Sequence, residues 1–304
     1  MTAAIHGARA PATGQGGVID PAVGADRARA PATGQRSASG PQNGPVAGAR
    51  APTTAPTEST QAPTVGTRNA ETRDAWVRAQ LATLPAGWRL LDAGAGERRY
   101  QRDCAHLRYV SQDFAQYDGQ GDGRGLQMGK WRAADVDLIC DIAAIPAPEA
   151  SFDAVLCTEV LEHVPEPAAA LRELARLLRS GGVLLLTAPF AALTHFAPYF
   201  YHTGLSRYFY EHWLPRLGLT IEEIAANGNF FEYLGQELRR LGDVARRWSP
   251  DGTGAPPEPE AQARVGPPAA ALDELLHWLE ARSAADCGSD ELLAFGLHVR
   301  ARKH

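Results

Sequence analysis

The sequence predicts an α/β fold in which helices and strands alternate around an open sheet. Three observations support this prediction. Residues 88–97 form an apolar run that ends in an acid and two glycines. Residues 108–113 form a second strand-like run, which again ends in an acid. Between residues 152 and 187, two apolar runs flank leucines at helical spacing. This alternation is typical of βαβ units, whose strands are parallel.

The turn after the first predicted strand is the centre of the expected site. Gly94 and Gly96 carry no Cβ and tolerate positive φ, so a ligand can approach their backbone closely. In an open α/β sheet, ligands bind at the carboxyl ends of the strands. A dinucleotide fold would place a third glycine where Arg99 stands, and Asp92 would repel a pyrophosphate but suits a cation. A nicotinamide oxidoreductase is therefore disfavoured.

The remaining elements are predicted in chain order from periodicity and turn residues. Strands are expected over residues 90–92, 108–113, 136–142, 152–156, 183–187, 219–225 and 292–300. Helices are expected from an Asn69 cap to about residue 84, from about Leu171 to a left-handed cap at Gly181 and Gly182, after a Ser206 cap, over 230–248 and over 271–281. The glycine-rich stretch 117–130 is expected to be a loop.

The chain is predicted to consist of one domain behind a tail. Residues 1–68 contain no Phe, Tyr or Trp and are rich in Ala, Pro, Gly and Thr. Such a segment cannot bury enough apolar surface to fold, so it is predicted to be a disordered, low-complexity tail, with a mistaken start site as the alternative. The domain then covers residues 69–304, with a proline- and glycine-rich insertion at 249–268 that is expected to be mobile.

Composition argues against several other classes. The formal charge is −5, and no basic stripe marks a nucleic-acid surface, so no nucleic-acid partner is expected. The four cysteines contain no C-x-x-C pair, which argues against a zinc site or a disulfide framework. The chain has neither an apolar signal region nor a run long enough to span a bilayer. We therefore expect a cytoplasmic protein without a membrane span.

The segment from residue 152 to 182 carries the most specific pattern, F-D-x-V…L-E-H-V-P…L-R-E-x-x-R-L-L-x-x-G-G. This order resembles the type 11 branch of the class I S-adenosylmethionine (SAM)-dependent methyltransferases. The string Asp92-Ala93-Gly94-Ala95-Gly96 is similar to the first motif of that class. The resemblance covers about residue 70 to the end. It implies a Rossmann-like fold with seven strands, the last antiparallel, with helices on both faces, and S-adenosyl-L-methionine as cofactor.

The cofactor is expected at the strand ends. The resemblance implies that Asp92 lies near the ammonium group and that the glycines pass beneath the cofactor. Asp113 stands about twenty residues after the first turn, where a carboxylate can accept from both ribose hydroxyls. By resemblance, Asp141 receives the adenine amino group; the alternative is that it caps the following turn. The predicted cofactor-binding residues are Asp92, Ala93, Gly94, Gly96, Asp113, Phe114, Asp141, Ile142 and Thr158.

One departure concerns the turn itself. Many methyltransferases carry another glycine where this chain has Arg98. The path of the turn is therefore open.

Three residues are predicted to be catalytic. A general base helps when the methyl acceptor is an alcohol, and His163 and His195 are the candidate bases. Glu159 is expected near the path of the methyl group. A structural role remains open for His163, which can bond the backbone, and Glu159 can instead bind the amino acid end of the cofactor. No metal is expected, because the acids are assigned to the cofactor and the histidines lack ligand spacing.

An aromatic, histidine-rich segment follows the fifth predicted strand, over residues 194–213. Related methyltransferases show a similar H-x-x-P-Y lid at this place. We predict that Tyr199 and His202 bind the substrate and that His195 belongs to the same lid. Packing is the expected role of Phe209, Trp213 and Leu214.

The leading functional prediction is O-methylation of a small-molecule or sugar-containing acceptor. A catalytically inactive SAM-binding regulatory protein of the same fold is the alternative. Aromatic and histidine side chains in the lid suit a sugar ring and a planar phenol equally. The leaning toward a glycan acceptor comes from resemblance to methyltransferases associated with surface polysaccharides.

Overall fold

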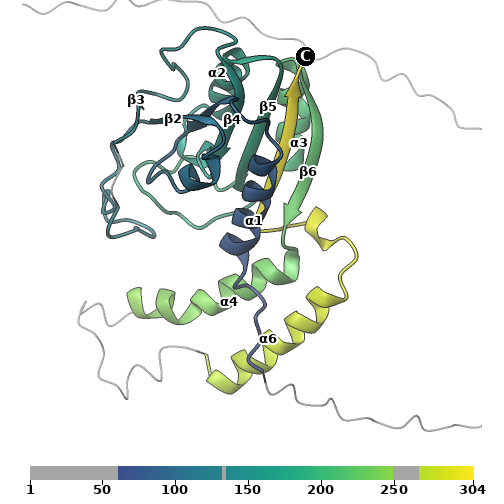
Figure 1. Ribbon diagram of the computed structural model, residues 1–304. Helices are drawn as coiled ribbons and strands as arrows, with labels where there is room; N and C mark the ends of the chain where they lie inside the picture. Colours follow the sequence, from purple (N-terminus) through teal and green to yellow (C-terminus); the bar gives the residue numbers. More distant parts are fainter. Residues whose placement is uncertain (1–60, 132–134, 249–266) are drawn as a thin grey trace, which may run out of the picture. The chain divides into compact units, whose positions relative to one another are not determined.

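Figure 1 shows the computed structural model, which describes residues 61–131, 135–248 and 267–304. The chain divides into two units, residues 1–57 and 58–304, and every described residue belongs to the second. Residues 1–60 of the predicted tail lie outside the described residues. So does almost all of the predicted insertion at 249–268.

The described chain contains seven strands and five α-helices, joined in places by short 3₁₀ turns. The strands are β1 (Arg89–Ala93), β2 (Arg108–Asp113), β3 (Leu138–Ile139), β4 (Phe152–Thr158), β5 (Leu178–Pro189), β6 (Leu219–Asn227) and β7 (Gly296–Lys303). The helices are α1 (Asn69–Ala82), α2 (Pro167–Leu177), α3 (Arg207–Arg216), α4 (Phe230–Arg247) and α6 (Ala269–Ala284). The 3₁₀ turns are η1 (Gln101–Cys104), η2 (Leu161–His163) and η3 (Ser289–Glu291).

All seven strands form one sheet in the order β3-β2-β1-β4-β5-β7-β6. Neighbours from β3 to β5 are parallel, whereas β7 runs antiparallel to both β5 and β6. The predicted mixed sheet with an antiparallel last strand is thus confirmed. The chain runs outward from β1 to β3 and then restarts at β4 on the other side of β1. This reversal is the topological switch point at which open α/β sheets bind ligands.

Helices cover both faces of the sheet, as predicted. On one face, Val77 and Leu81 of α1 pack with Leu90, Leu156 and Leu185 from the central strands. On the other face, α2 and α3 cover the side chains of the central strands that point away from α1. That second cluster includes Leu91, Val155, Leu171, Leu174, Leu184, Tyr210 and Leu214. Since both faces of the central strands are buried, the only open side of β1 and β4 is their ends.

Two predicted caps differ from the structure. Asn69 is the first residue of α1 and not its cap; the preceding Arg68 makes no side-chain cap bond. Helix α2 ends at Leu177 rather than at the glycine pair, because Leu178 is extended and pairs with Phe152 of β4. Residues 181–182 therefore lie inside β5. Strand pairing, which the helical periodicity does not report, decides this boundary.

Strand β3 is shorter than predicted, with two residues instead of seven. Its only neighbour is β2, which it meets at the pairs Gln112–Leu138 and Asp113–Ile139. Just before β3, the carboxylate of Asp137 accepts from the amide (2.8 Å) and the hydroxyl (2.7 Å) of Ser111. A side chain thus replaces the ladder hydrogen bonds that would extend the strand.

Residues 61–68, which the sequence assigns to the tail, pack against α4 and α6. Val65 is 1% exposed and lies in a cluster with Leu276 and Leu279 of α6. The amide of Gly66 donates to Glu232 of α4 (2.7 Å), and that of Thr64 donates to a carboxylate of α6 (2.8 Å). The ordered part of the chain therefore begins before the predicted boundary at residue 68.

This packing predicts a difference between two truncated chains. A chain that starts at residue 61 should be more stable to unfolding than one that starts at residue 69, by about 2–4 kcal/mol, because the shorter chain loses the buried Val65 and its neighbouring hydrogen bonds. Urea denaturation of both chains measures the difference. Equal midpoints and slopes would show that residues 61–68 add nothing to the fold.

Candidate functional site

Four carboxylates lie at the carboxyl ends of four adjacent parallel strands. Asp92 belongs to β1, Asp113 ends β2, Asp141 follows β3 and Glu159 follows β4. Because β3, β2, β1 and β4 are neighbours in the sheet, the fold brings these acids to one edge. That edge contains the switch point between β1 and β4.

Asp92 is a buried acid, with 2% of its surface exposed. Its carboxylate accepts one side-chain hydrogen bond, from the hydroxyl of Tyr109 at 2.5 Å. Burial raises the pKa of Asp92 from 3.8 to about 6; the Tyr109 bond opposes this rise and the charge of Asp113 adds to it. The ionised carboxylate of Asp92 therefore has too little neighbouring positive charge to offset its burial. A cationic ligand group beside Asp92 would supply it.

Asp113 is held in place by backbone amides. One carboxylate oxygen accepts from the amide of Gly96 (2.9 Å), and the other accepts from the amide of Ala115 (2.8 Å). A carboxylate oxygen has two lone-pair sites, so each oxygen can accept one further hydrogen bond. This capacity matches two vicinal hydroxyls of a ribose.

The glycine turn requires its glycines. Gly94 has φ of 76° and Gly96 has φ of 51°. A Cβ on Gly94 would lie 2.4 Å from a methyl group of Val160, and a Cβ on Gly96 would lie 2.7 Å from the ring of Trp131. Arg98 also adopts positive φ, 55°. The residue that replaces a family glycine thus keeps the left-handed conformation, which resolves the path of the turn.

The other predicted cofactor residues occupy different surroundings. Ala93 and Ile142 belong to the hydrophobic core. The carboxylate of Asp141 accepts from the amide of Ala143 (2.8 Å), which is the capping role that was its alternative. Phe114 meets the ring of Tyr199 edge-on, 5.0 Å between centroids, and Thr158 is the last residue of β4. The buried Asp92, the free lone pairs of Asp113 and the side-chain-free turn fit the amino acid and ribose parts of SAM.

Glu159 is strained and paired. Its φ of 53° places a non-glycine residue in the left-handed region directly after β4. Such outliers cluster at functional sites and persist because the surroundings hold them. One carboxylate oxygen of Glu159 pairs with Arg73 of α1 (2.9 Å), and the other accepts from the hydroxyl of Thr187 in β5 (2.8 Å). Sequence reasoning did not find Arg73, which lies far from Glu159 in the chain.

His163 and His195 contact each other, with ring centroids 4.7 Å apart. Nδ1 of His163 lies 2.6 Å from the carbonyl oxygen of Tyr199, and Nδ1 of His195 lies 2.8 Å from that of Leu193. A carbonyl oxygen only accepts, so Nδ1 carries the proton in both rings and Nε2 keeps a lone pair. Burial and the neighbouring His195 lower the pKa of His163 to about 4, and burial lowers the pKa of His195. Both rings are therefore neutral at neutral pH.

Glu162 is a site residue that sequence reasoning missed. Its side chain is 0% exposed, and neither carboxylate oxygen has a hydrogen-bond partner among the described residues. Burial, with the charge of Glu159, raises the pKa of Glu162 well above its usual value. One oxygen lies 3.6 Å from Nε2 of His163 and 4.0 Å from Nε2 of His195. The available signal was an acid next to a histidine inside an otherwise apolar run.

This cluster also bears on the prediction that no metal binds. That prediction assumed that the histidines lack ligand spacing along the chain. In the fold, ligand atoms of Glu162, His163 and His195 all lie within 4.8 Å of one another. Spacing along the chain did not indicate this cluster, because His195 comes from a segment distant from Glu162 and His163.

The segment predicted to be a lid, residues 194–213, is hydrogen-bonded to the η2 turn and the residues that follow it. The amides of Tyr201 and His202 both donate to the carbonyl oxygen of Glu162 (3.0 and 3.1 Å). Nε2 of His202 lies 3.1 Å from the carbonyl oxygen of Val164. Among the residues assigned to packing, Leu214 is buried, and Phe209 and Trp213 pack against the same core, as expected.

An aromatic cluster joins the glycine-rich loop to the lid. Tyr117 stacks on Phe196 with 4.2 Å between ring centroids, and Trp131 meets Phe196 edge-on at 5.2 Å. Trp131 is also the side chain closest to the missing Cβ of Gly96. The cluster therefore covers the turn, and the sequence did not single it out because its members come from separate loops.

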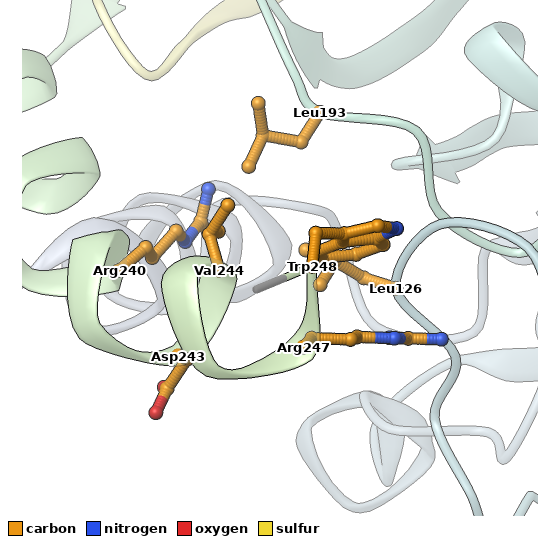
Figure 2. A pocket seen from close by; sticks show the side chains of 7 residues that line it. All are labelled: Leu126, Leu193, Arg240, Asp243, Val244, Arg247 and Trp248. Atoms are coloured by element: carbon orange, nitrogen blue, oxygen red, sulfur yellow. The ribbon is translucent and has the colours of Figure 1, made fainter. Parts of the chain in front are cut away.

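A cavity of about 310 Å³ lies between the C-terminal half of α4 and the residues Leu126 and Leu193 (Figure 2). Figure 2 shows Arg240 and Val244 reaching from α4 toward Leu193, while Asp243 points away. Leu126 on its wall forms a β-bridge with His195 of the lid. The lining residues are Leu126, Leu193, Arg240, Asp243, Val244, Arg247 and Trp248. The cavity thus combines apolar side chains with guanidinium groups.

Residues 91–186 match a family model described as a methyltransferase domain, of type 11. A ubiquinone biosynthesis O-methyltransferase of Xanthomonas axonopodis pv. citri (strain 306) is 39% identical over 106 residues, 34% of this chain and 44% of that one. A demethylmenaquinone methyltransferase of Renibacterium salmoninarum is 34% identical over 161 residues, 52% of this chain and 61% of that one. The chain thus spans less than two thirds of either relative.

Among solved structures, the [4+2]-cyclase SpnF is 20% identical, with 77% of this chain and 81% of that chain covered and a TM-score of 0.45. At this level the likeness says nothing about function. In the part of the chain that the structure describes, no helix is long and apolar enough to cross a membrane. Residues 91–186 thus match the type 11 methyltransferase-domain family that the sequence pattern resembles.

Proposed function

We propose that the protein transfers a methyl group from S-adenosyl-L-methionine to an oxygen atom of a small acceptor. The observation that carries this proposal is the row of strand-end carboxylates beside the glycine turn, at the switch point of a methyltransferase domain. When bound, the cofactor supplies an activated methyl group on a sulfonium. The protein's own part is then to bind, orient and exclude water.

The proposed cofactor contacts follow the chemistry of each strand end. Asp92 would hold the ammonium group, because its buried carboxylate lacks a compensating charge. Asp113 would accept hydrogen bonds from the ribose hydroxyls with its remaining lone pairs. Asp141, after β3, would receive the adenine amino group, with Ile142 on the ring side.

His163 and His195 are proposed to activate the acceptor hydroxyl. Both rings are neutral and keep a lone pair on Nε2, as activation of a hydroxyl requires. Glu159 is proposed to position the site rather than to take a proton, because both of its oxygens are engaged, one by Arg73 and one by Thr187. Tyr199 and His202 remain proposed acceptor contacts of the lid.

The cavity beside the lid favours a phenolic or quinol acceptor over a glycan. Four of its lining side chains are apolar, and the charged ones are Arg240, Arg247 and Asp243, with Arg240 also paired to Glu237 (2.7 Å). This combination suits an apolar aromatic molecule that carries an acidic group. It agrees with relatives named for ubiquinone biosynthesis and for demethylmenaquinone. The leaning toward a glycan acceptor has no support from these lining residues.

Transfer of tritium from methyl-labelled SAM tests the proposal. We expect label in a dihydroxybenzoate-type phenol or a quinol and none in glycan acceptors. Arg240→Ala should raise KM for an acidic phenol about tenfold, because one charge-assisted contact is lost. Arg282→Ala is the control, since Arg282 is exposed on α6 and does not line the cavity. Label only in glycans would overturn the acceptor class; cofactor binding without label in any acceptor would favour the regulatory alternative.

A further inference from the structure

Three hydrogen-bond acceptors face one another between η2 and the lid. Oε1 of Glu162 lies 3.6 Å from Nε2 of His163 and 4.0 Å from Nε2 of His195. Each imidazole already donates its Nδ1 proton to a backbone carbonyl oxygen. Nε2 of each neutral ring is therefore an acceptor, like the carboxylate oxygen. When Glu162 is ionised, the arrangement lacks a positively charged or donating atom at its centre.

Burial makes this deficit costly. Glu162 is 0% exposed, and among the described residues its two oxygens have no hydrogen-bond partner. The nearby guanidinium of Arg73 is paired with Glu159 instead. A buried carboxylate without a partner is strongly unfavourable, and such groups are generally paired or bind metals. The surroundings thus favour a cation at this point.

The two histidines are oriented as metal ligands are. Metal-binding histidines almost always donate their other ring N–H to a carbonyl or carboxylate, which fixes the ring and its tautomer. His163 does so with Tyr199 (2.6 Å) and His195 does so with Leu193 (2.8 Å). The carbonyl group of Tyr199 belongs to the predicted lid and that of Leu193 directly precedes it, and the amides of Tyr201 and His202 donate to the carbonyl oxygen of Glu162. The supporting hydrogen bonds are therefore already in place.

We infer that Glu162, His163 and His195 form a binding site for a divalent transition-metal ion. Two imidazole nitrogens and one carboxylate oxygen suit Zn²⁺, Fe²⁺, Co²⁺ or Mn²⁺ better than Ca²⁺ or Mg²⁺, which prefer oxygen ligands. Tetrahedral zinc with bonds of about 2.0–2.1 Å places its ligand atoms about 3.3 Å apart. The Glu162 oxygen lies 3.6 and 4.0 Å from the two Nε2 atoms, and all three ligand atoms lie within 4.8 Å of one another, so side-chain rotations would have to shorten these separations when the metal binds.

Three protein ligands leave at least one coordination position open. In catalytic sites with three protein ligands, this position takes water or substrate. Metal binding here does not depend on the proposed function, whereas its use in methyl transfer does. In that use the two Nε2 lone pairs would bind the metal and no longer act as bases. An acceptor hydroxyl at the open position would instead release its proton to solvent more readily, because the metal stabilises the resulting oxyanion.

Metal binding is tested on the full chain after treatment with a chelator. Calorimetric titration with Zn²⁺ should give one ion per chain, and Co²⁺ should give visible absorption bands. Glu162→Gln and His195→Ala should each weaken Zn²⁺ binding at least tenfold. His106→Ala and His212→Ala remove exposed histidines outside the cluster and should leave the affinity unchanged.

Several results would overturn the inference. Zn²⁺ binding that Glu162→Gln leaves unchanged would place the metal elsewhere. A wild-type chain that binds no metal, while Glu162→Gln raises its melting temperature, would show a carboxyl group that holds a proton instead. Circular dichroism confirms that the variants fold, and His195→Ala, in a partly exposed loop, provides a second variant. Titration of the metal-free chain with S-adenosylhomocysteine separates failure of the metal site from failure of the proposed function.

Discussion

Asp92→Asn is expected to weaken binding of S-adenosylhomocysteine by about 30–150-fold, because it removes a charge-assisted contact to the ammonium group that contributes about 2–3 kcal/mol. The amide oxygen of Asn can still accept from the hydroxyl of Tyr109, so the local structure should be kept. Isothermal titration calorimetry measures the affinity. Asp137→Asn is a control, because that acid lies outside the proposed cofactor contacts and bonds Ser111. Unchanged affinity in Asp92→Asn would contradict the assignment of the ammonium site.

The same substitution should make the protein more stable at neutral pH. The pKa of Asp92 is about 6 in the folded protein and 3.8 ordinarily, so the folded state binds its proton more tightly than the unfolded chain does. Through Asp92, the unfolding free energy of the wild type is therefore highest below pH 4 and falls as the pH rises to 6. Above pH 6 this decrease amounts to up to about 3 kcal/mol. Asn cannot ionise and avoids this loss.

Urea denaturation at pH 4 and pH 8 measures this effect. We expect Asp92→Asn to exceed the wild type in unfolding free energy at pH 8 and to match it at pH 4. A variant that is less stable than the wild type at pH 8 would show that the buried carboxylate is compensated in the folded protein.

Gly94→Ala is expected to abolish cofactor binding and to destabilise the fold more than Gly123→Ala does. The two glycines have nearly the same φ, 76° and 75°. An alanine at either position therefore has the same backbone strain, about 1–2 kcal/mol. At Gly123 the new Cβ meets nothing within 4 Å, whereas at Gly94 it would lie 2.4 Å from Val160. The overlap adds about 1–3 kcal/mol and displaces the turn.

Thermal unfolding and calorimetry on the two variants separate the effect of the overlap between the new Cβ and Val160 from that of backbone strain. Gly123→Ala should bind S-adenosylhomocysteine like the wild type. If both variants lose the same stability and both still bind S-adenosylhomocysteine, the absence of a Cβ at Gly94 is not required for cofactor binding. If Gly94→Ala folds but binds no cofactor, the turn is the binding element.

The sheet and the strand-end acids could be predicted because they depend on local signals. Apolar runs, helical leucine spacing and glycines after an acid each lie within about ten residues of sequence. For example, β2 begins and ends where the sequence predicts, at residues 108 and 113. The pattern around Glu162 also identified the family.

Features that depend on distant contacts could not be predicted. The partner of Glu159 is Arg73 on α1, and the neighbour of His163 is His195 beyond β5. Helical periodicity continued toward residue 181, but pairing of Leu178 with β4 ends the helix earlier. Val65 lies in an otherwise polar stretch, and its burial depends on α6, more than two hundred residues later.

A crystal structure with S-adenosylhomocysteine shows whether the cofactor binds along the glycine turn at the switch point. We expect ribose hydroxyls bonded to Asp113, the ammonium group beside Asp92 and the cofactor passing along the backbone of Gly94 and Gly96. S-adenosylhomocysteine bound in the cavity beside α4, or bound without contact to Asp113, would contradict this expectation.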